Sequence, residues 1–331
     1  MIKHLKVIIL VESLVIAALL IAVSILGFKL HNNKQEIKNG LLSPRVYSGI
    51  LEPKSLLVTN YAPLRKSLDS FINENNLTVS VYVENLRNGA FTGVNERVGF
   101  PAASISKMPL AILIMKKVDD GKLSLDTMIE VNDSDKTSTW GNLYKTKDKR
   151  LPLRVVFENM LKESDNTAFN ILRHYSNPED MAPILSYVDY YSEEAINAEE
   201  GGEELITPKS IYNLYSSLYL STILEPQSSE YILSLLTNTT FDIKKIAELP
   251  GNVTVAHKFG ARYIGNVRSL HDCGIIYNGD SRLFYCVMTK DLKYDYAVQV
   301  IGAVVNKIFY YSLKARETLD QYKELDKNNN K

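Results

Sequence analysis

Ser104 and Lys107 are the residues whose types and spacing first indicate covalent chemistry. The segment Ser104-Ile105-Ser106-Lys107 places a hydroxyl and an amine three positions apart. On a helix, residues i and i+3 share a face, so the Lys107 amine would reach the Ser104 hydroxyl. A serine at a helix N-terminus also lies near backbone N–H groups that favour developing negative charge. Taken alone, the motif also fits an ordinary amphipathic helix with a surface lysine.

Two later segments carry the partners that such a serine needs. Ser164-Asp165-Asn166 lies between two expected helices, at 153–162 and 167–174, where a loop can present a hydroxyl and an amide. Lys258-Phe259-Gly260-Ala261 follows an apolar run at 253–256, as the end of a strand lining a cleft would. The three segments together predict a site with a nucleophile, two amines and hydrogen-bonding groups.

The composition excludes several other kinds of chemistry. The 331 residues contain 38 Lys and Arg and 38 Asp and Glu, so the formal net charge is zero. The charge therefore gives no reason to expect a nucleic-acid partner. Five His and two Cys lack the spacing of metal ligands, and no glycine-rich phosphate loop is present. We therefore expect no metal and no cofactor.

The expected elements place these segments in a two-lobed α+β (α/β) domain. Strands at both ends of the domain, with helices between them, imply one sheet built from distant parts of the chain and an inserted helical lobe. A site is expected between the two lobes. The expected helices are 64–75, 153–162, 167–174, 208–224 and 294–319, and the expected strands are 77–84, 253–258, 267–277 and 283–289, with Asn278-Gly279 as a hairpin turn.

The order S-x-x-K, S-D-N and K-x-G resembles the signature set of class A β-lactamases and penicillin-binding proteins. The neighbouring residues agree, in the segments 163–168 and 255–258. The resemblance covers about 250 residues and implies a β-lactamase/transpeptidase-like fold, an antiparallel sheet flanked by helices with an all-helical lobe.

This resemblance implies a role for each side chain in acylation. Ser104 would attack the carbonyl of a strained lactam or of a D-Ala-D-Ala-like amide and form an acyl-enzyme. Lys107, with its pKa lowered by burial and by Lys258, would take the Ser104 proton. Ser164 would pass a proton to the leaving nitrogen while Lys258 orients and polarises its hydroxyl.

The resemblance also implies the groups that bind substrate. Asn166 would hold the amide of the substrate side chain. The backbone N–H groups of Ser104 and Ala261, with Gly260 beside them, would form an oxyanion hole, in which one donor contributes about 3 kcal/mol.

Deacylation depends on a loop that carries E-x-x-L-N in class A enzymes. Glu193-Glu194-Ala195-Ile196-Asn197 fits this pattern with Ile for Leu. Glu193 would activate the hydrolytic water, and Asn197 would contact the substrate. Glutamates are frequent between 193 and 204, so a solvated acidic surface is the alternative.

Two residues depart from the family pattern. Phe259 replaces the usual Thr or Ser, whose hydroxyl helps to hold the substrate carboxylate, so carboxylate recognition is in doubt. Arg268 is the favoured substitute for that contact and Arg262 the second, although each fits a surface cation too. Pro109 removes a helix hydrogen bond, so we expect a kink or an irregular first turn after Lys107.

Other side chains allow more than one interpretation. Trp140 and Tyr144 fit loop aromatics packed on their own domain, or an aromatic wall of the site. His257 is expected to point away from the site, since strand neighbours alternate faces. Cys273 and Cys286 lie on the two arms of the expected hairpin and are predicted as buried thiols, with a disulfide as the alternative.

The N-terminus predicts a membrane anchor. Residues 7–28 are apolar apart from Glu12, two Ser and a Gly, which is long for a cleavable signal. The predicted organisation is a cytoplasmic start and transmembrane helix at 1–30, a linker at 31–60, the catalytic domain at 61–325 and a tail at 326–331. The domain would face the cell exterior or the periplasm.

The sequence thus predicts a serine β-lactamase that hydrolyses β-lactams through an acyl-enzyme on Ser104. A membrane-anchored D,D-peptidase acting on peptidoglycan stems is the nearest alternative. A non-catalytic sensor acylated by β-lactams is a further alternative, and a catalytically decayed scaffold is favoured only by Phe259.

Overall fold

The computed structural model describes Ser24 and residues 41–42, 60–190, 199–200, 203–264 and 267–329. The chain divides into two compact units, Met1–Leu51 and Glu52–Lys331, and the elements below belong to the second. The anchor predicted at 7–28 lies outside the described residues, apart from Ser24. Within the described residues, no helix is both long enough and apolar enough to cross a bilayer.

A five-stranded antiparallel sheet forms the centre of the domain, as predicted. Its order is β2-β1-β10-β9-β8, so strands from the two ends of the domain pair in its middle. Its strands are β1 (Thr78–Asn85), β2 (Phe91–Val94), β8 (Thr254–Ile264), β9 (Val267–Asn278) and β10 (Ser281–Lys290).

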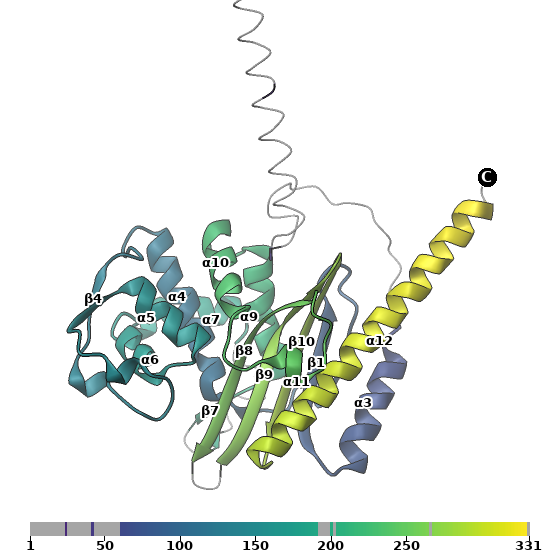
Figure 1. Cartoon of the computed structure of the whole chain (residues 1–331), viewed down its shortest axis with the longest axis horizontal. Helices are drawn as coiled ribbons and strands as arrows, with labels where there is room; N and C mark the ends of the chain where they lie inside the picture. Colours follow the sequence, from purple (N-terminus) through teal and green to yellow (C-terminus); the bar gives the residue numbers. More distant parts are fainter. Residues whose placement is uncertain are drawn as a thin grey trace, which may run out of the picture. The chain divides into compact units, whose positions relative to one another are not determined.

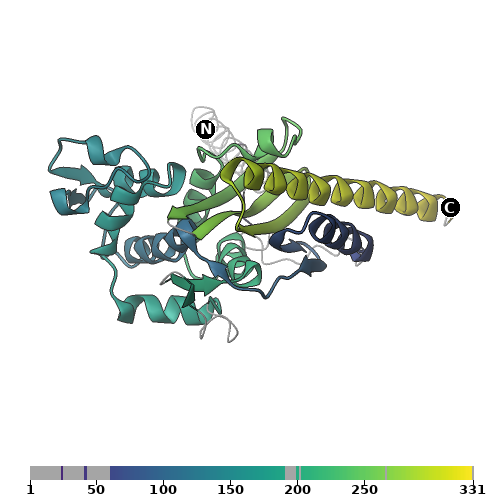
Figure 2. The same cartoon turned by 90° about the horizontal axis from the view of Figure 1, so that it is seen from below.

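Helices cover both faces of this sheet (Figures 1 and 2). Helices α3 (Ala62–Glu74) and α12 (Tyr294–Asn329) pack on one face, and α9 (Pro208–Leu220) packs on the other. Helix α3 buries Leu64, Leu68 and Ile72, which are four residues apart and so share one side of the helix. These side chains join the core with alternate residues of β1 such as Val79 and Val81.

A helical lobe lies beside the sheet (Figure 1). Its helices are α4 (Lys107–Asp119), α5 (Leu153–Lys162), α6 (Asn166–Arg173), α7 (Pro178–Tyr187) and α10 (Pro226–Leu236). The short elements are β3 (Phe100–Pro101), β4 (Met128–Glu130), β5 (Arg150–Pro152), β6 (Glu199–Glu200), β7 (Glu203–Ile206), α11 (Ile243–Ile246) and the 3-10 turns η1 (Ala103–Ser106), η2 (Asp133–Asp135) and η3 (Leu143–Lys145).

Most predicted elements are present, and α12 and β8 extend well beyond their predicted ends. Helix α5 has the predicted bounds, whereas α12 continues to Asn329. Strand β8 continues to Ile264 because residues 259–264 pair with β9 in one long hairpin.

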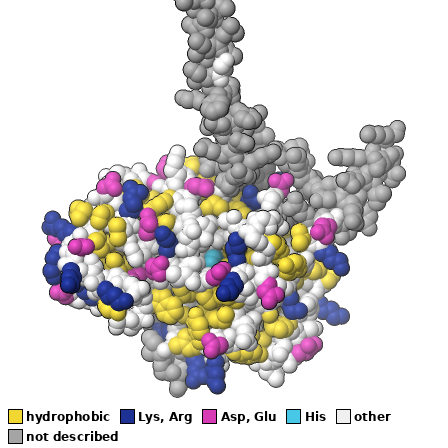
Figure 3. Space-filling model, in the orientation of Figure 1, with side chains coloured by type: hydrophobic (Ala, Val, Ile, Leu, Met, Phe, Trp, Pro, Cys, Tyr) yellow, Lys and Arg dark blue, Asp and Glu magenta, His cyan; other side chains and the backbone are white. Residues whose placement is uncertain are grey.

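Charged side chains of both signs are interspersed on the face of the domain shown in Figure 3. This distribution agrees with the balanced numbers of acidic and basic residues in the sequence.

Candidate active site

Ser104 lies in the 3-10 turn η1 directly before α4, and the side chain of Lys107 returns to it. The Nζ of Lys107 lies 3.0 Å from the Oγ of Ser104. Lys107 is only 2% exposed, whereas Ser104 is half-buried. The prediction of a kink or an irregular first turn after Lys107 is wrong, because the 3-10 turn η1 ends at Ser106 and α4 runs as an α-helix from Lys107. Pro109 is the third residue of α4, where helix N–H groups have no partner within the helix, so it causes no kink.

Ser164 joins the two lysines of the site. Its backbone has φ of +55°, which turns the chain sharply between α5 and α6. Its hydroxyl accepts a hydrogen bond from Lys258 at 2.7 Å and one from Lys107 at 3.3 Å. Its carbonyl also accepts a hydrogen bond from Lys107. One residue therefore orients both amines.

Asn166 is held in one orientation by its neighbours. Its Oδ1 accepts a hydrogen bond from Lys107 at 2.7 Å, and its Nδ2 donates to Thr139 at 2.8 Å. Its backbone N–H donates to the carbonyl of Trp140 at 3.0 Å. These contacts fix the amide next to the nucleophile.

The carboxylate of Asp165 holds the turn between α5 and α6 in place. Its carboxylate caps α6 by accepting from the N–H of Ala168 at 2.8 Å, and it accepts from the N–H of Leu143 at the same distance. Gly141, with φ of +89°, lies so close that an added Cβ would be 2.0 Å from the Asp165 Oδ2. An aspartate before an apolar helical run is an N-cap signal, but the sequence did not predict its second contact.

Gly260 lets strand β8 approach the nucleophile. A Cβ at this position would lie 3.1 Å from the backbone nitrogens of both Ser104 and Ile105. The close backbone approach therefore leaves little room for a side chain at the glycine of the K-x-G motif. Ala261 follows it on β8.

Burial sets the charge of both amines. Burial lowers the pKa of Lys107 to about 7, and the nearby Asp165 opposes this shift. Lys258 is fully buried, and burial together with the positive charge of Lys107 holds its pKa well below the usual range. An amine with a pKa of about 7 can act as a general base at neutral pH.

Phe259 forms part of an aromatic group with Phe241 and Trp140. Its ring stacks on Phe241 at 5.2 Å and lies 5.8 Å from Trp140. Phe259 is 2% exposed and Trp140 is 37% exposed. Trp140 thus packs against β8 from the loop that also contacts Asn166, as the interpretation of a loop aromatic packed on its own domain predicts. Tyr144 is half-buried, and its ring lies 5.5 Å from the Nζ of Lys145.

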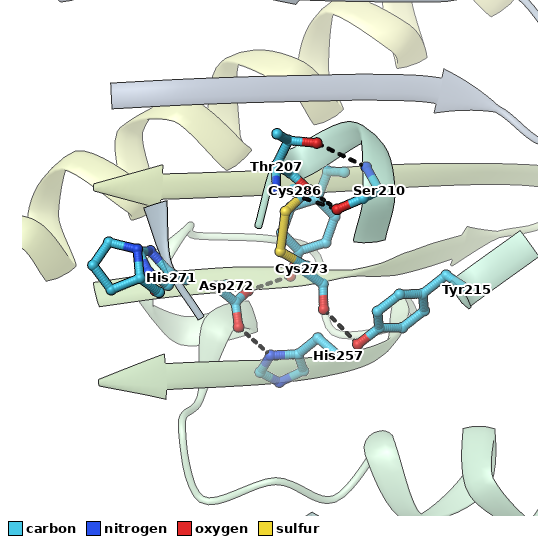
Figure 4. Close-up of a disulfide and its surroundings, with 10 residues drawn as sticks. Thr207, Ser210, Tyr215, His257, His271, Asp272, Cys273 and Cys286 are labelled. Atoms are coloured by element: carbon cyan, nitrogen blue, oxygen red, sulfur yellow. Dashed lines mark hydrogen bonds and ion pairs between the residues drawn. A yellow bond between two sulfur atoms is a disulfide. The ribbon is translucent and has the colours of Figure 1, made fainter. Parts of the chain in front are cut away.

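His257, on strand β8, belongs to a buried group of hydrogen-bonded side chains (Figure 4). The ring of His257 bonds to Asp272 at 2.7 Å and to Thr239 at 2.7 Å. It points away from the Ser164 hydroxyl that its neighbour Lys258 contacts, as strand alternation predicts.

Cys273 and Cys286 form a disulfide, so the favoured prediction of two free thiols is wrong. The two residues are direct cross-strand partners of β9 and β10, with their Cα atoms 3.9 Å apart. The sequence placed them on the two arms of a hairpin but did not give the register that sets them opposite each other.

The structure does not bring every predicted residue to the site. Arg268 is exposed and pairs with Tyr263, five residues along β8 from Lys258, which is roughly 16 Å at the usual rise of a strand. Arg262 is four residues from Lys258 on the same strand. Glu193 and Asn197 lie outside the described residues.

Comparison with known proteins gives the family. The sequence model that describes the β-lactamase enzyme family matches residues 63–311 of this chain. The chain belongs to this family. The resemblance to class A β-lactamases predicted from the three motifs is thereby confirmed.

Individual relatives are distant. The chain is 23% identical over 239 residues to β-lactamase VEB-1 of Pseudomonas aeruginosa, a match covering 67% of this chain and 80% of that protein. It is 24% identical over 277 residues to the extended-spectrum β-lactamase PER-1 of the same species, covering 77% and 89%.

Two kinds of solved structure share the fold. The extended-spectrum β-lactamase TLA-1 has a TM-score of 0.67 at 22% identity, covering 75% of this chain and 98% of that one. The protein PBP-A has a TM-score of 0.69 at 22% identity, covering 78% and 100%. These likenesses confirm the predicted β-lactamase/transpeptidase-like fold.

Proposed function

We propose that this protein is a serine β-lactamase that opens β-lactams through an acyl-enzyme on Ser104. The observation that carries the proposal is the 3.0 Å hydrogen bond between Ser104 and a buried Lys107 whose pKa is about 7. The names of the relatives VEB-1 and PER-1 support the same substrate class.

Acylation follows from the hydrogen bonds of the site. Neutral Lys107 takes the proton of the Ser104 hydroxyl as its Oγ bonds to the lactam carbonyl carbon. The carbon–nitrogen bond of the lactam breaks, and the nitrogen receives a proton through the Ser164 hydroxyl, which Lys258 and Lys107 orient. The N–H groups of Ser104 and Ala261 stabilise the oxyanion in this scheme.

Deacylation is assigned to Glu193. Its carboxylate takes a proton from the water that attacks the acyl carbonyl, and the Ser104 hydroxyl is regenerated. Asn197 contacts the substrate from the same loop. This assignment is supported by the E-x-x-I-N pattern alone, because these residues lie outside the described part of the chain.

A chromogenic cephalosporin and intact-protein mass together test the proposal on the full-length chain. The wild type is expected to turn over repeatedly, Ser104→Ala to form no adduct, and Glu193→Gln to accumulate the acyl-enzyme. A wild type that neither turns over the cephalosporin nor forms an adduct, together with no adduct in Glu193→Gln, would sink the proposal.

A D,D-peptidase is the second candidate. The similarity to PBP-A, including a mutant form described as an acyl-enzyme complex with penicillin G, favours it. A stable wild-type adduct with the cephalosporin, together with release of D-Ala from a peptidoglycan stem peptide, would select this function over hydrolysis of β-lactams.

We also propose that residues 7–28 anchor the domain to a membrane and that the domain lies outside the cytoplasm. The apolar run supports the anchor, and the disulfide supports an oxidising compartment. Protease treatment of spheroplasts, whose outer barrier has been removed, is expected to degrade the domain, and protection from protease would contradict the proposed side of the membrane.

A further inference from the structure

The turn that carries Ser104 has a strained backbone. Ala103, the residue before the nucleophile, has φ of +46°, a left-handed conformation that is disfavoured for residues with a side chain. Such a conformation persists only where neighbouring contacts hold it. The N–H of Ile105 donates to the carbonyl of Ala102 at 3.1 Å. The hydroxyl of Ser106 donates to the carbonyl of Ala103 at 2.8 Å. Both contacts lie within the turn, so neither fixes it to the sheet.

His271, on strand β9, fixes the upstream end of this turn to the central sheet. Its Nε2 lies 2.8 Å from the carbonyl oxygen of Pro101, three residues before the nucleophile. Pro101 ends β3, a strand of two residues, and as a proline it has no backbone N–H to contribute. The ring of His271 also meets Phe100 edge to face, with 5.9 Å between the ring centres. One side chain of the sheet therefore contacts both residues of β3.

Strand register places His271 on the side of the sheet that meets the nucleophile. It pairs with Gly260, whose Cβ position lies 3.1 Å from the backbone nitrogen of Ser104. Directly paired residues share a face of a sheet, so the His271 side chain lies on the face from which Gly260 approaches the turn. The hydrogen-bonded pair of His257 and Asp272 belongs to the opposite face, and Figure 4 shows the His271 ring apart from that pair.

The His271 side chain is a hydrogen-bond donor in one defined form. It is 0% exposed, and burial lowers its pKa to about 4, while the hydrogen bond to the Pro101 carbonyl opposes this shift. The ring is therefore neutral at pH 7 and has a single N–H. Since a carbonyl oxygen only accepts, the proton is on Nε2 and Nδ1 is unprotonated.

We propose that His271 is a positioning residue for acylation, because its Nε2–H holds the Pro101 carbonyl and thereby keeps the strained turn in the conformation that presents Ser104. Without this donor, Ala103 can return to a negative φ. The Ser104 hydroxyl would then move away from the Nζ of Lys107, which lies 3.0 Å from it in the structure. The contact is a property of the free protein, and only its consequence for acylation rests on the proposed function.

Nuclear magnetic resonance of the full-length wild type tests the contact without any substrate. The ring signals of His271 are assigned by their loss in His271→Gln. At about pH 7, the ¹⁵N shifts should show a protonated Nε2 and an unprotonated Nδ1. A ring protonated on Nδ1 alone, or on both nitrogens, would overturn the proposal, and this measurement does not depend on the folding of any variant.

Two variants separate the donor from the packing of the ring. His271→Gln keeps an N–H donor at the place of Nε2 but removes the ring, whereas His271→Phe keeps a ring against Phe100 but has no donor. Stopped-flow kinetics with the chromogenic cephalosporin give the acylation rate and the dissociation constant of the noncovalent complex. We expect His271→Phe to acylate Ser104 at least roughly 10-fold more slowly with little change in that dissociation constant, and His271→Gln to acylate at nearly the wild-type rate.

The backbone amide signals of Ser104 and Ile105 report on the turn in the free protein. They should shift in His271→Phe and stay close to their wild-type positions in His271→Gln. Wild-type signals and a wild-type acylation rate in His271→Phe, or changes in His271→Gln as large as those in His271→Phe, would overturn the proposal. A wild type that β-lactams do not acylate would count against the proposed function alone, since the ring and amide signals are measured without substrate.

Discussion

Lys107 and Lys258 donate hydrogen bonds to the same oxygen, the hydroxyl of Ser164, from opposite lobes of the domain. Burial lowers the pKa of both amines, and at Lys258 the positive charge of Lys107 adds to this effect. The arrangement therefore supplies a base near neutral pH while keeping a donor for the relay serine.

Acylation of Ser104 should become faster as pH rises through about 7, because Lys107 loses its proton there and becomes a base. The rate of adduct formation with a slowly hydrolysed β-lactam, followed by intact mass between pH 5 and 9, measures this change. A rate independent of pH across this interval would contradict a role for Lys107 as the base.

The same residue should make stability depend on pH. The pKa of Lys107 is about 7 in the folded chain and 10.5 ordinarily, so the unfolded state binds more protons between these values. The free energy of unfolding should then rise with pH above about 7, with a contribution from Lys107 of up to about 1.4 kcal/mol per pH unit. Urea unfolding at pH 7 to 9 should show a smaller slope for Lys107→Met and an unchanged slope for Lys66→Met, a change at an exposed position.

Gly260→Ala should impair the site more than the fold. The added methyl would press on the backbone nitrogens of Ser104 and Ile105 at 3.1 Å, which displaces the nucleophile and lowers kcat/KM by roughly 10- to 100-fold. Gly251→Ala is the matched control, since nothing lies within 4 Å of its Cβ position. Equal activity of the two variants would show that the close approach is unimportant for catalysis.

Phe259→Thr should lower the KM for penicillins that carry a free carboxylate, because it restores a hydroxyl beside Lys258. The lost ring packing against Phe241 and Trp140 should cost about 3 kcal/mol of stability. Phe241→Leu loosens the same aromatic group without adding a hydroxyl and should leave KM higher than in Phe259→Thr. The emission of Trp140, the single tryptophan of the chain, reports whether each variant keeps the packing.

The disulfide should protect both cysteines from alkylation. Under denaturing conditions without reductant, iodoacetamide should add nothing to the chain, and after reduction it should add two groups, because the sequence contains two Cys. Replacing both by alanine should lower the free energy of unfolding by about 2–4 kcal/mol. Alkylation before reduction would mean that the thiols are free.

The local part of the site could be predicted from the sequence. Ser104 and Lys107 are three residues apart, so their contact needs only helical geometry. The strands around Lys258 follow from alternating and β-branched residues, and the order of the motifs gives the family.

The remainder depends on register, which a single sequence does not give. Arg268 seemed suited to bind a carboxylate, but the long β8–β9 hairpin places it beside Tyr263. The pairing of Asp272 with Phe259, and of Cys273 with Cys286, is set by the same register. A one-residue slip would reverse the faces of all these side chains.

The place of β10 in the sheet has a consequence for how the protein is made. This strand is the last in the chain, yet it lies in the middle of the sheet and pairs with β1, which is roughly 200 residues earlier. During synthesis, the edge of β1 that pairs with β10 therefore stays unpaired until nearly the whole domain has left the ribosome. Chains that stop before residue 281 would contain all three motifs yet lack the strand that joins β1 to β9, and they would be inactive and prone to aggregate.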